Sequence, residues 1–148
     1  MTAQENSIID QAIAILDSRL KTFELIITKP EDVKNFLRLK LEECEREIFA
    51  VLYLDTQNKL IKYSELFYGT YNEAKVWARE IAREVLATNC SSVVLVHNHP
   101  SGTQEASKAD IAITKRIKEC LELVDAKVLD HMIVCKGKVL SFAEEGLI

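Results

Sequence analysis

The chain has 148 residues, of which 48% are hydrophobic and 28% charged, and its formal net charge is −4. This length and composition are typical of one globular domain, and the acidic balance argues against a dedicated nucleic-acid-binding surface. No apolar run approaches the ~18 residues of a membrane span and the N-terminus lacks a signal-peptide pattern, so we expect a cytoplasmic protein without a membrane segment.

Hydrophobic periodicity predicts ten elements in the order αβαββαβαββ. Apolar residues at helical spacing mark helices near 7–20, 29–44, 72–87 and 107–124. Runs rich in β-forming residues mark strands near 22–30, 47–55, 59–69, 91–100, 126–135 and 138–142. We expect the second and third strands to form a hairpin, the last two strands to form another, and the almost wholly apolar strand 91–100 to be central. This order predicts a mixed sheet with helices packed against it, in the α/β (α+β mixed) class.

The four cysteines are too widely separated for a zinc ribbon or a C-x-x-C redox motif. They are Cys44, Cys90, Cys120 and Cys135. In a protein without a secretion signal, free thiols are the expected state.

Two of the three histidines, His97 and His99, stand two residues apart at the end of the predicted strand 91–100. Side chains two apart on a strand point to the same face, so the two imidazoles can converge on one ion. Asp110 follows in the first turn of the next predicted helix, after a loop rich in turn formers. Two histidines and one carboxylate are a ligand set typical of catalytic zinc, which keeps a fourth position for water.

Other interpretations compete with the metal site. Ser107-x-x-Asp110 is also a capping-box-like arrangement, and taken alone it is more often a helix cap. The two histidines alone are as consistent with a polar strand end. The chain lacks the Pro-Cys-x-x-Cys of zinc deaminases, and its literal HNH string is not the dispersed motif of the nucleases of that name. The loop and the spacing together favour a metal.

His97-x-His99, Ser107 and Asp110 together resemble the JAMM motif of the JAB/MPN+ metallopeptidase superfamily. The strings HNHPSG, SKAD, VLDHMIV and SFAEEGLI are similar to the RadC family within it. The resemblance implies a JAB/MPN-like, cytidine-deaminase-like mixed sheet flanked by helices. It divides the chain into an N-terminal helix, residues 1–21, and a RadC-like JAB/MPN+ domain, residues 22–148.

The superfamily motif also has an upstream glutamate, in the form Glu-x-x-small-x-Leu. Glu47, in EIFAVL, fits this form best, and Glu45 and Glu43 are the alternatives. From the residues alone, Glu47 would be read as a solvated residue between a helix and a strand. Its importance is therefore implied by the resemblance only.

The resemblance implies a zinc-dependent reaction with separate roles for the site residues. Zinc held by His97, His99 and Asp110 would lower the pKa of water toward ~7. Glu47 would act as the general base, and Ser107 would stabilise the oxyanion. The implied activity is cleavage of peptide or isopeptide bonds in a protein or peptide substrate, although the family carries an old DNA-repair label.

Asp130 and His131 lie on the predicted strand 126–135 and should point to opposite faces, so only one of them can face the site. His131 is then either a structural histidine with satisfied hydrogen bonds or a residue that orients a metal ligand.

Longer RadC-type chains carry a glycine-rich helix-hairpin-helix region that binds DNA. The first twenty residues here contain no glycine and predict at most one helix, so we expect only weak DNA binding. The alternative function is a non-catalytic zinc-containing module that binds DNA or a replication or repair protein. A homo-oligomer is compatible with either function.

Overall fold

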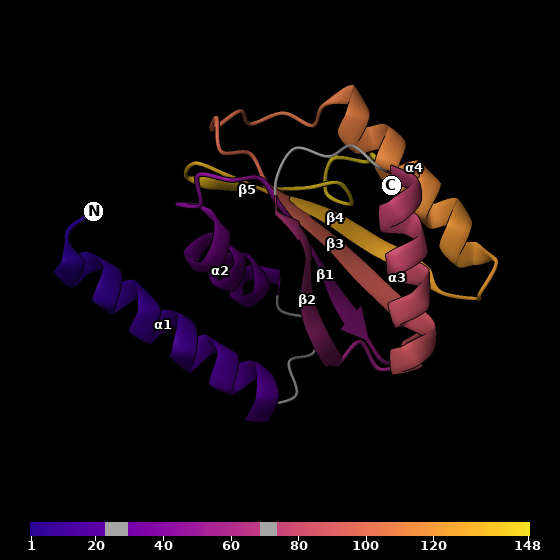
Figure 1. Cartoon of the computed structure of the whole chain (residues 1–148), viewed down its shortest axis with the longest axis horizontal. Helices are drawn as coiled ribbons and strands as arrows, with labels where there is room; N and C mark the ends of the chain where they lie inside the picture. The colour runs from indigo at the N-terminus through magenta and orange to yellow at the C-terminus, as the bar shows by residue number, and fades with distance from the viewer. Residues whose placement is uncertain (23–29, 69–73) are drawn as a thin grey trace.

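The computed structural model describes residues 1–22, 30–68 and 74–148 (Figure 1). In chain order its elements are α1 (Ala3–Thr22), α2 (Pro30–Leu41), β1 (Ile48–Leu54), β2 (Leu60–Tyr68), α3 (Ala74–Thr88), β3 (Ser92–Asn98), α4 (Lys108–Glu122), β4 (Lys127–Cys135) and β5 (Lys138–Ser141). The strand predicted near 22–30 lies outside the described residues, except that Thr22 ends α1 and Pro30 begins α2.

The described strands form one mixed sheet in the order β2-β1-β3-β4-β5. β1 pairs antiparallel with β2 and with β3, β3 pairs parallel with β4, and β4 pairs antiparallel with β5. This topology confirms both predicted hairpins and the central place of β3. Because parallel neighbours need a crossover, α4 carries the chain from the end of β3 back to the start of β4.

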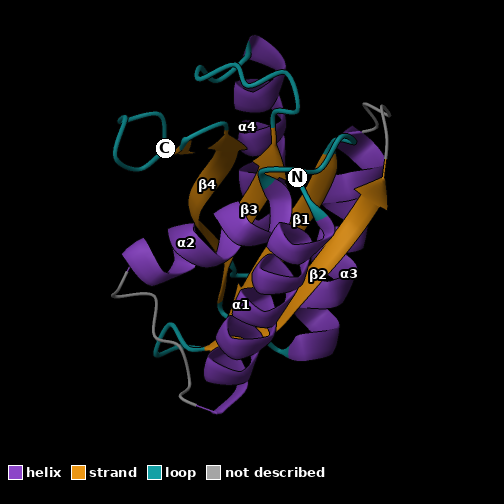
Figure 2. Cartoon of the chain, turned by 90° about the vertical axis from the view of Figure 1, so that its left-hand side faces the viewer, coloured by secondary structure: helices purple, strands orange, loops and turns teal. Residues whose placement is uncertain are grey.

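Helices cover both faces of the sheet, so its central strands are buried on both sides (Figure 2). Along β1, Ala50 and Leu52 pack in the cluster that contains α2. The alternate residues Val51 and Tyr53 pack in the cluster that contains α3 and α4. This strict alternation assigns each position of a central strand to one of the two faces. It therefore also decides where polar residues at the strand ends must point.

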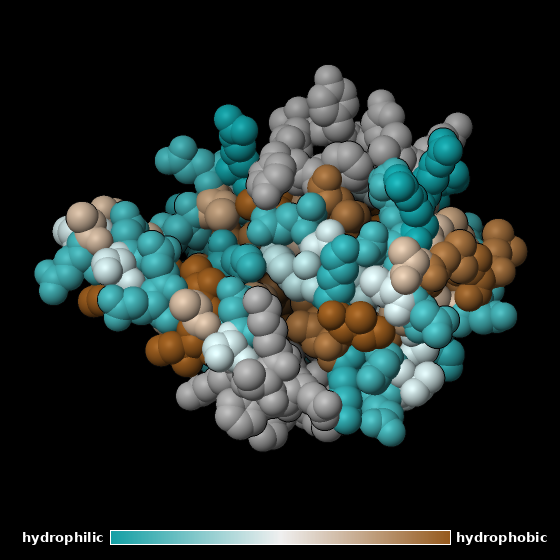
Figure 3. Space-filling view, turned by 60° about the horizontal axis from the view of Figure 1, so that its bottom comes forward, coloured by the Kyte–Doolittle hydropathy of each residue, from teal (hydrophilic) through white to brown (hydrophobic). Residues whose placement is uncertain are grey.

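The N-terminal helix α1 is longer than predicted and packs chiefly on α2 (Figure 1). Leu16 contacts the core, whereas Ile8 and Ile15 are 58% and 56% exposed. In the view of Figure 3, hydrophobic surface occurs as separate groups among hydrophilic side chains. The helix predicted near 7–20 is therefore present, and it contacts the remainder of the protein chiefly through α2.

The helix predicted near 72–87 is present as α3, and one of its large apolar residues lies outside the buried face. Ile81 and Val85 are buried, but Leu86 is 65% exposed. Leu86 follows Val85 directly, and a rotation of ~100° per residue carries it past the edge of the buried face.

All four cysteines are free thiols, as predicted. Among the described helices, none combines the length and the apolar character that a membrane crossing requires.

Candidate metal centre

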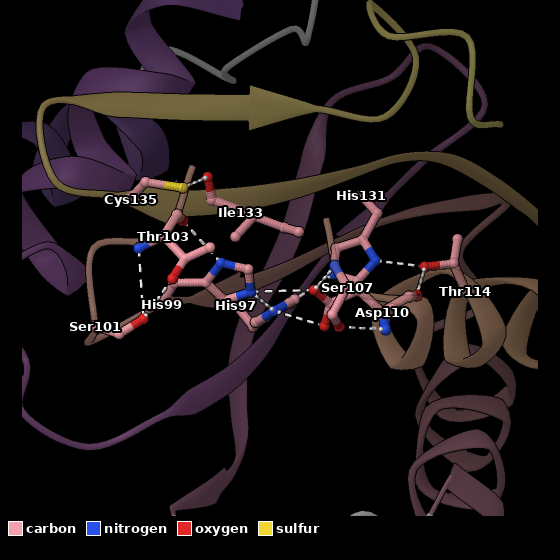
Figure 4. Close-up of polar contacts among 10 residues, drawn as sticks. All are labelled: His97, His99, Ser101, Thr103, Ser107, Asp110, Thr114, His131, Ile133 and Cys135. Carbon is pink, nitrogen blue, oxygen red and sulfur yellow. Dashed lines mark hydrogen bonds and ion pairs between the residues drawn. The ribbon is translucent and has the colours of Figure 1, made fainter. Parts of the chain in front are cut away.

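The end of β3 and the first turn of α4 bring three predicted ligands together (Figure 4). Val93 and Leu95 face α3 and α4, and the same alternation carries His97 and His99 to that side. The crossover then returns the chain so that Asp110, in the first turn of α4, faces both imidazoles. His97 and Asp110 are buried, and His99 is half-buried. The predicted convergence of these three side chains is therefore present in the structure.

The distances between the three side chains suit a single small cation. The Nε2 atoms of His97 and His99 lie 3.0 Å apart. Asp110 Oδ1 is 3.0 Å from His97 Nε2, and its Oδ2 is 3.1 Å from His99 Nε2. Ligand atoms at ~2.0–2.1 Å from a tetrahedral zinc ion would be roughly 3.3 Å apart. The observed triangle is slightly tighter, and a small adjustment would admit the ion.

The hydrogen bonding of His99 suits a cation in this cluster. His99 Nδ1 is 3.0 Å from the carbonyl oxygen of Thr103, which can only accept, so Nδ1 must carry a proton. In the neutral ring, Nε2 then presents a lone pair to a carboxylate and to a second imidazole nitrogen. Three acceptors so close together repel one another unless a proton or a metal ion lies between them. The donor set thus fits a divalent ion such as zinc.

The pKa values of the cluster agree with a site that attracts positive charge. The hydrogen bond to Asp110 raises the pKa of His99 above its ordinary value, against the effect of burial. Burial raises the pKa of Asp110, but the contacts with the ring nitrogens of His97 and His99 outweigh it and hold that pKa well below the usual range. Asp110 is therefore ionised, as a metal ligand must be.

The loop between β3 and α4 fixes His99 by its backbone as well as by its ring. The His99 N–H donates to the Val134 carbonyl at 2.9 Å, which continues the pairing of β3 with β4. The Gly102 N–H donates to the His99 carbonyl at 2.9 Å and closes a turn. Gly102 has a φ of +81°, a conformation that favours glycine. The Pro-Ser-Gly sequence after His99 thereby turns the chain toward α4.

Ser107 and Asp110 form a helix cap and also contribute to the cluster. The Asp110 N–H donates to Ser107 Oγ at 3.0 Å, and the Ser107 N–H donates to Asp110 Oδ2 at 2.8 Å. The two interpretations of Ser107-x-x-Asp110 therefore do not compete. The same carboxylate completes the capping box and faces both histidines, so the cap orients the ligand.

Glu47 precedes β1 on the side of the metal centre and is exposed. Phe49 pairs with His97 in the antiparallel register, and continuing that register by two residues sets Glu47 opposite His99. The charge of Glu47 contributes to the raised pKa of His99. Glu47 directly precedes β1, whereas Glu43 and Glu45 lie earlier in the connecting segment, so the placement favours Glu47, whose catalytic role stays a prediction.

Asn98, which the sequence analysis passed over, joins the segment that carries Glu47 to the strand that carries the histidines. It is 1% exposed and points to the α2 face, opposite to its two neighbours. Its Oδ1 accepts from the Ile48 N–H at 2.7 Å, and its Nδ2 donates to the Arg46 carbonyl at 2.9 Å. Longer contacts reach the carbonyls of Leu41 and Cys44. The signal in the sequence was an amide side chain at the end of an apolar strand, because a buried amide needs polar partners.

Replacing Asn98 with Ala should destabilise the fold by roughly 2–5 kcal/mol, because buried carbonyl and N–H groups lose their partner. Urea denaturation of the metal-free protein measures this loss. Asn35, exposed on α2, is the control, and Asn35→Ala should stay within about 0.5 kcal/mol of wild type. Equal stability of the two variants would mean that the Asn98 contacts contribute nothing.

A bulge in β4 turns His131 toward His97. Val128 packs on the α3 and α4 side and Leu129 on the α2 side, and Leu129 is skipped in the pairing with β3. The extra residue reverses the alternation, so His131 reaches the α4 side, where its Nε2 lies 2.8 Å from His97 Nδ1. Asp130 binds the Ser141 hydroxyl instead. Of Asp130 and His131, only His131 contacts His97, one of the predicted ligands.

Comparison with known proteins agrees with this fold. A family model described as the RadC-like JAB domain matches residues 27–147. A UPF0758 protein of Vibrio cholerae is 46% identical over 144 residues, which cover 97% of this chain and 90% of the relative. UPF0758 proteins of Methylibium petroleiphilum and Cellvibrio japonicus are 49% and 45% identical over 83% and 97% of this chain. The matched segments span 55% and 63% of those two relatives, whose names state no activity. With a match over most of its length and a mixed sheet flanked by helices, the chain belongs to the RadC-like JAB domain family.

Proposed function

We propose that this protein is a zinc-dependent metallohydrolase that cleaves an amide bond, peptide or isopeptide, in a protein or peptide substrate. The observation that carries the proposal is the triangle of His97, His99 and Asp110, with Glu47 directly before the neighbouring strand β1. A site with three protein ligands leaves room for a reactant, whereas structural zinc sites are closed by four. Free thiols favour a cytoplasmic location for this activity.

The residues of the triangle and the residues around it could each take a separate role in hydrolysis. A zinc ion held there would polarise the substrate carbonyl and lower the pKa of water toward ~7. Glu47 would accept the proton of the attacking water and pass it to the leaving amine nitrogen. Ser107 accepts its capping bond through an oxygen lone pair, and no described residue accepts from its hydroxyl. That hydrogen is therefore available for the oxyanion.

The exposure of Glu47 and Ser107 supports approach of a substrate from the solvent side. Glu47 and Ser107 are exposed, while His97 is 3% exposed. The two groups assigned to the reacting atoms therefore face solvent, and the deepest ligand does not.

A peptide library tests this function directly. Protein loaded with one zinc ion per chain is incubated with unmodified and isopeptide-linked peptides, and products are identified by mass spectrometry. Cleavage should stop with a chelator and return when zinc is added. Zinc-loaded protein that cleaves neither set would overturn the catalytic assignment and favour a non-catalytic module.

Duplex DNA should bind weakly, with an affinity that falls steeply as salt is raised. The formal net charge of −4 disfavours a polyanion, and any local basic contacts would be screened by counterions. Fluorescence anisotropy with a labelled duplex, at low and at physiological salt, measures this. Tight binding at physiological salt would contradict the prediction and support recruitment to DNA.

A further inference from the structure

We propose that Thr114 and His131 are positioning residues, which hold His97 in the tautomer whose Nε2 lone pair faces the other two ligands. The inference rests on the zinc site of the proposed function, but it does not depend on hydrolysis. His131 is fully buried and Thr114 is 3% exposed, so neither is open to a substrate. Both would act through His97 (Figure 4).

The direction of the hydrogen bonds can be followed from the helix backbone. The Thr114 hydroxyl lies 2.7 Å from the Asp110 carbonyl, which can only accept, so the hydroxyl donates to it. A hydroxyl has one hydrogen, and its contact of 2.5 Å with His131 Nδ1 must therefore be donated by the ring. His131 thus carries its proton on Nδ1.

The protonation of His131 Nε2 then determines which nitrogen of His97 carries a proton. His131 is fully buried, and among the described residues its ring forms hydrogen bonds only with Thr114 and His97, neither of which is a carboxylate. An unpaired charge is costly in such a place, so the ring is neutral and its Nε2 is an acceptor. His97 Nδ1, at 2.8 Å, must donate to it. With its proton on Nδ1, a neutral His97 presents the lone pair of Nε2 to Asp110 and His99. This is the form in which an imidazole binds a metal.

The chain of hydrogen bonds starts and ends near the same residue. It starts at the backbone carbonyl of Asp110 and runs through Thr114 and His131 to His97, whose Nε2 lies 3.0 Å from the Asp110 carboxylate. The two predicted ligands His97 and Asp110 are therefore linked by one chain of hydrogen bonds through α4 and β4. Partners of this kind orient ligands, and their removal typically weakens metal binding by ~10–100-fold.

The other histidine ligand is held differently. His99 donates to the Thr103 carbonyl, in an exposed loop segment. His97 is instead fixed from within the core, where the rings of Phe49 and Phe142 also pack on His131, at centroid distances of 5.9 and 4.7 Å. If His131 and Thr114 had a purely structural role, only their packing would matter, and their hydrogen bonds would not affect zinc binding. The positioning role and the structural role therefore predict different zinc affinities.

Zinc affinity of folded variants separates these roles. Thr114→Val keeps the shape but removes the hydroxyl, and Thr114→Ser keeps the hydroxyl. Competition with a chromophoric chelator should give roughly 10–100-fold weaker zinc binding for Thr114→Val and nearly wild-type binding for Thr114→Ser. Urea denaturation of the metal-free proteins records stability separately. Unchanged zinc affinity in folded Thr114→Val would overturn the proposal, whatever its stability.

A second pair of variants covers the case in which Thr114→Val does not fold. In His131→Gln, the amide oxygen can accept from His97 and the amide nitrogen can donate to Thr114, whereas His131→Leu can do neither. His131→Gln should bind zinc at least about tenfold more tightly than His131→Leu. Equal zinc affinities would count against positioning by hydrogen bonds.

The tautomers are also directly measurable in the metal-free wild type. Nitrogen-15 chemical shifts of the side chains should show His131 protonated on Nδ1 alone and His97 protonated on Nδ1. A proton on His131 Nε2 would overturn the proposal. Because this readout needs no metal, it stands even if the wild type binds no zinc, a result that would defeat the proposed function instead.

Discussion

Glu47→Gln should slow amide hydrolysis by roughly 10²–10⁴-fold while zinc binding and the fold remain intact. Gln has nearly the same shape as Glu, but it cannot accept a proton from the attacking water. Glu47 is exposed and belongs to no helix or strand, so the substitution should cost little stability. Initial rates on any peptide that the wild type cleaves, at matched zinc content, give the comparison.

The control for this experiment is Glu45→Gln, an exposed carboxylate two residues earlier in the same segment. It should retain the wild-type rate. Equal rates for Glu47→Gln and wild type would remove Glu47 from the mechanism. Loss of activity in Glu45→Gln or Glu43→Gln instead would show that the base is one of the alternatives.

Replacing one histidine ligand should reduce bound zinc from one ion per chain to almost none after dialysis. His99→Ala is the cleaner variant because His99 is half-buried, whereas His97→Ala also leaves His131 Nε2 without its donor. Two remaining ligands provide much less chelation than three. Elemental analysis after equal dialysis measures the metal.

Asp10→Ala, at an exposed position on α1, is the matched control and should keep the full zinc content. Zinc should also raise the melting temperature of the wild type and of Asp10→Ala, but not that of His99→Ala, because an ion that binds only the folded state stabilises it. Full zinc in both histidine variants would show that the ligand assignment is wrong.

The convergence of His97, His99 and Asp110 was predictable because it depends on local rules. A period of two places His97 and His99 on one face, and the start of a helix places Asp110 within reach. All three lie within residues 97–110. The sequence also predicted the central place of β3, because a strand covered on both faces is apolar throughout.

The supporting contacts were not predictable, because they join distant parts of the chain. Asn98 bonds to Ile48 and to Arg46 across separations of 50 and 52 residues. The bulge at Leu129 leaves no sequence signal, yet it decides that His131 meets His97. Thr114 gave a weak signal, four residues after Asp110 on the same helix face. Only the register of the strands reveals these partners.

The charges of the three predicted ligands and Glu47 determine how the net charge of the site would change during the proposed reaction. Two neutral imidazoles and one carboxylate leave a divalent cation with one net positive charge, whereas four cysteine thiolates would leave two negative ones. An ionised Glu47 beside the site brings the local sum to zero. As Glu47 takes up a proton and the carbonyl oxygen becomes negative, that sum does not change. The negative charge is relocated from Glu47 to the oxyanion within one small volume, so surrounding water would have little net charge to accommodate.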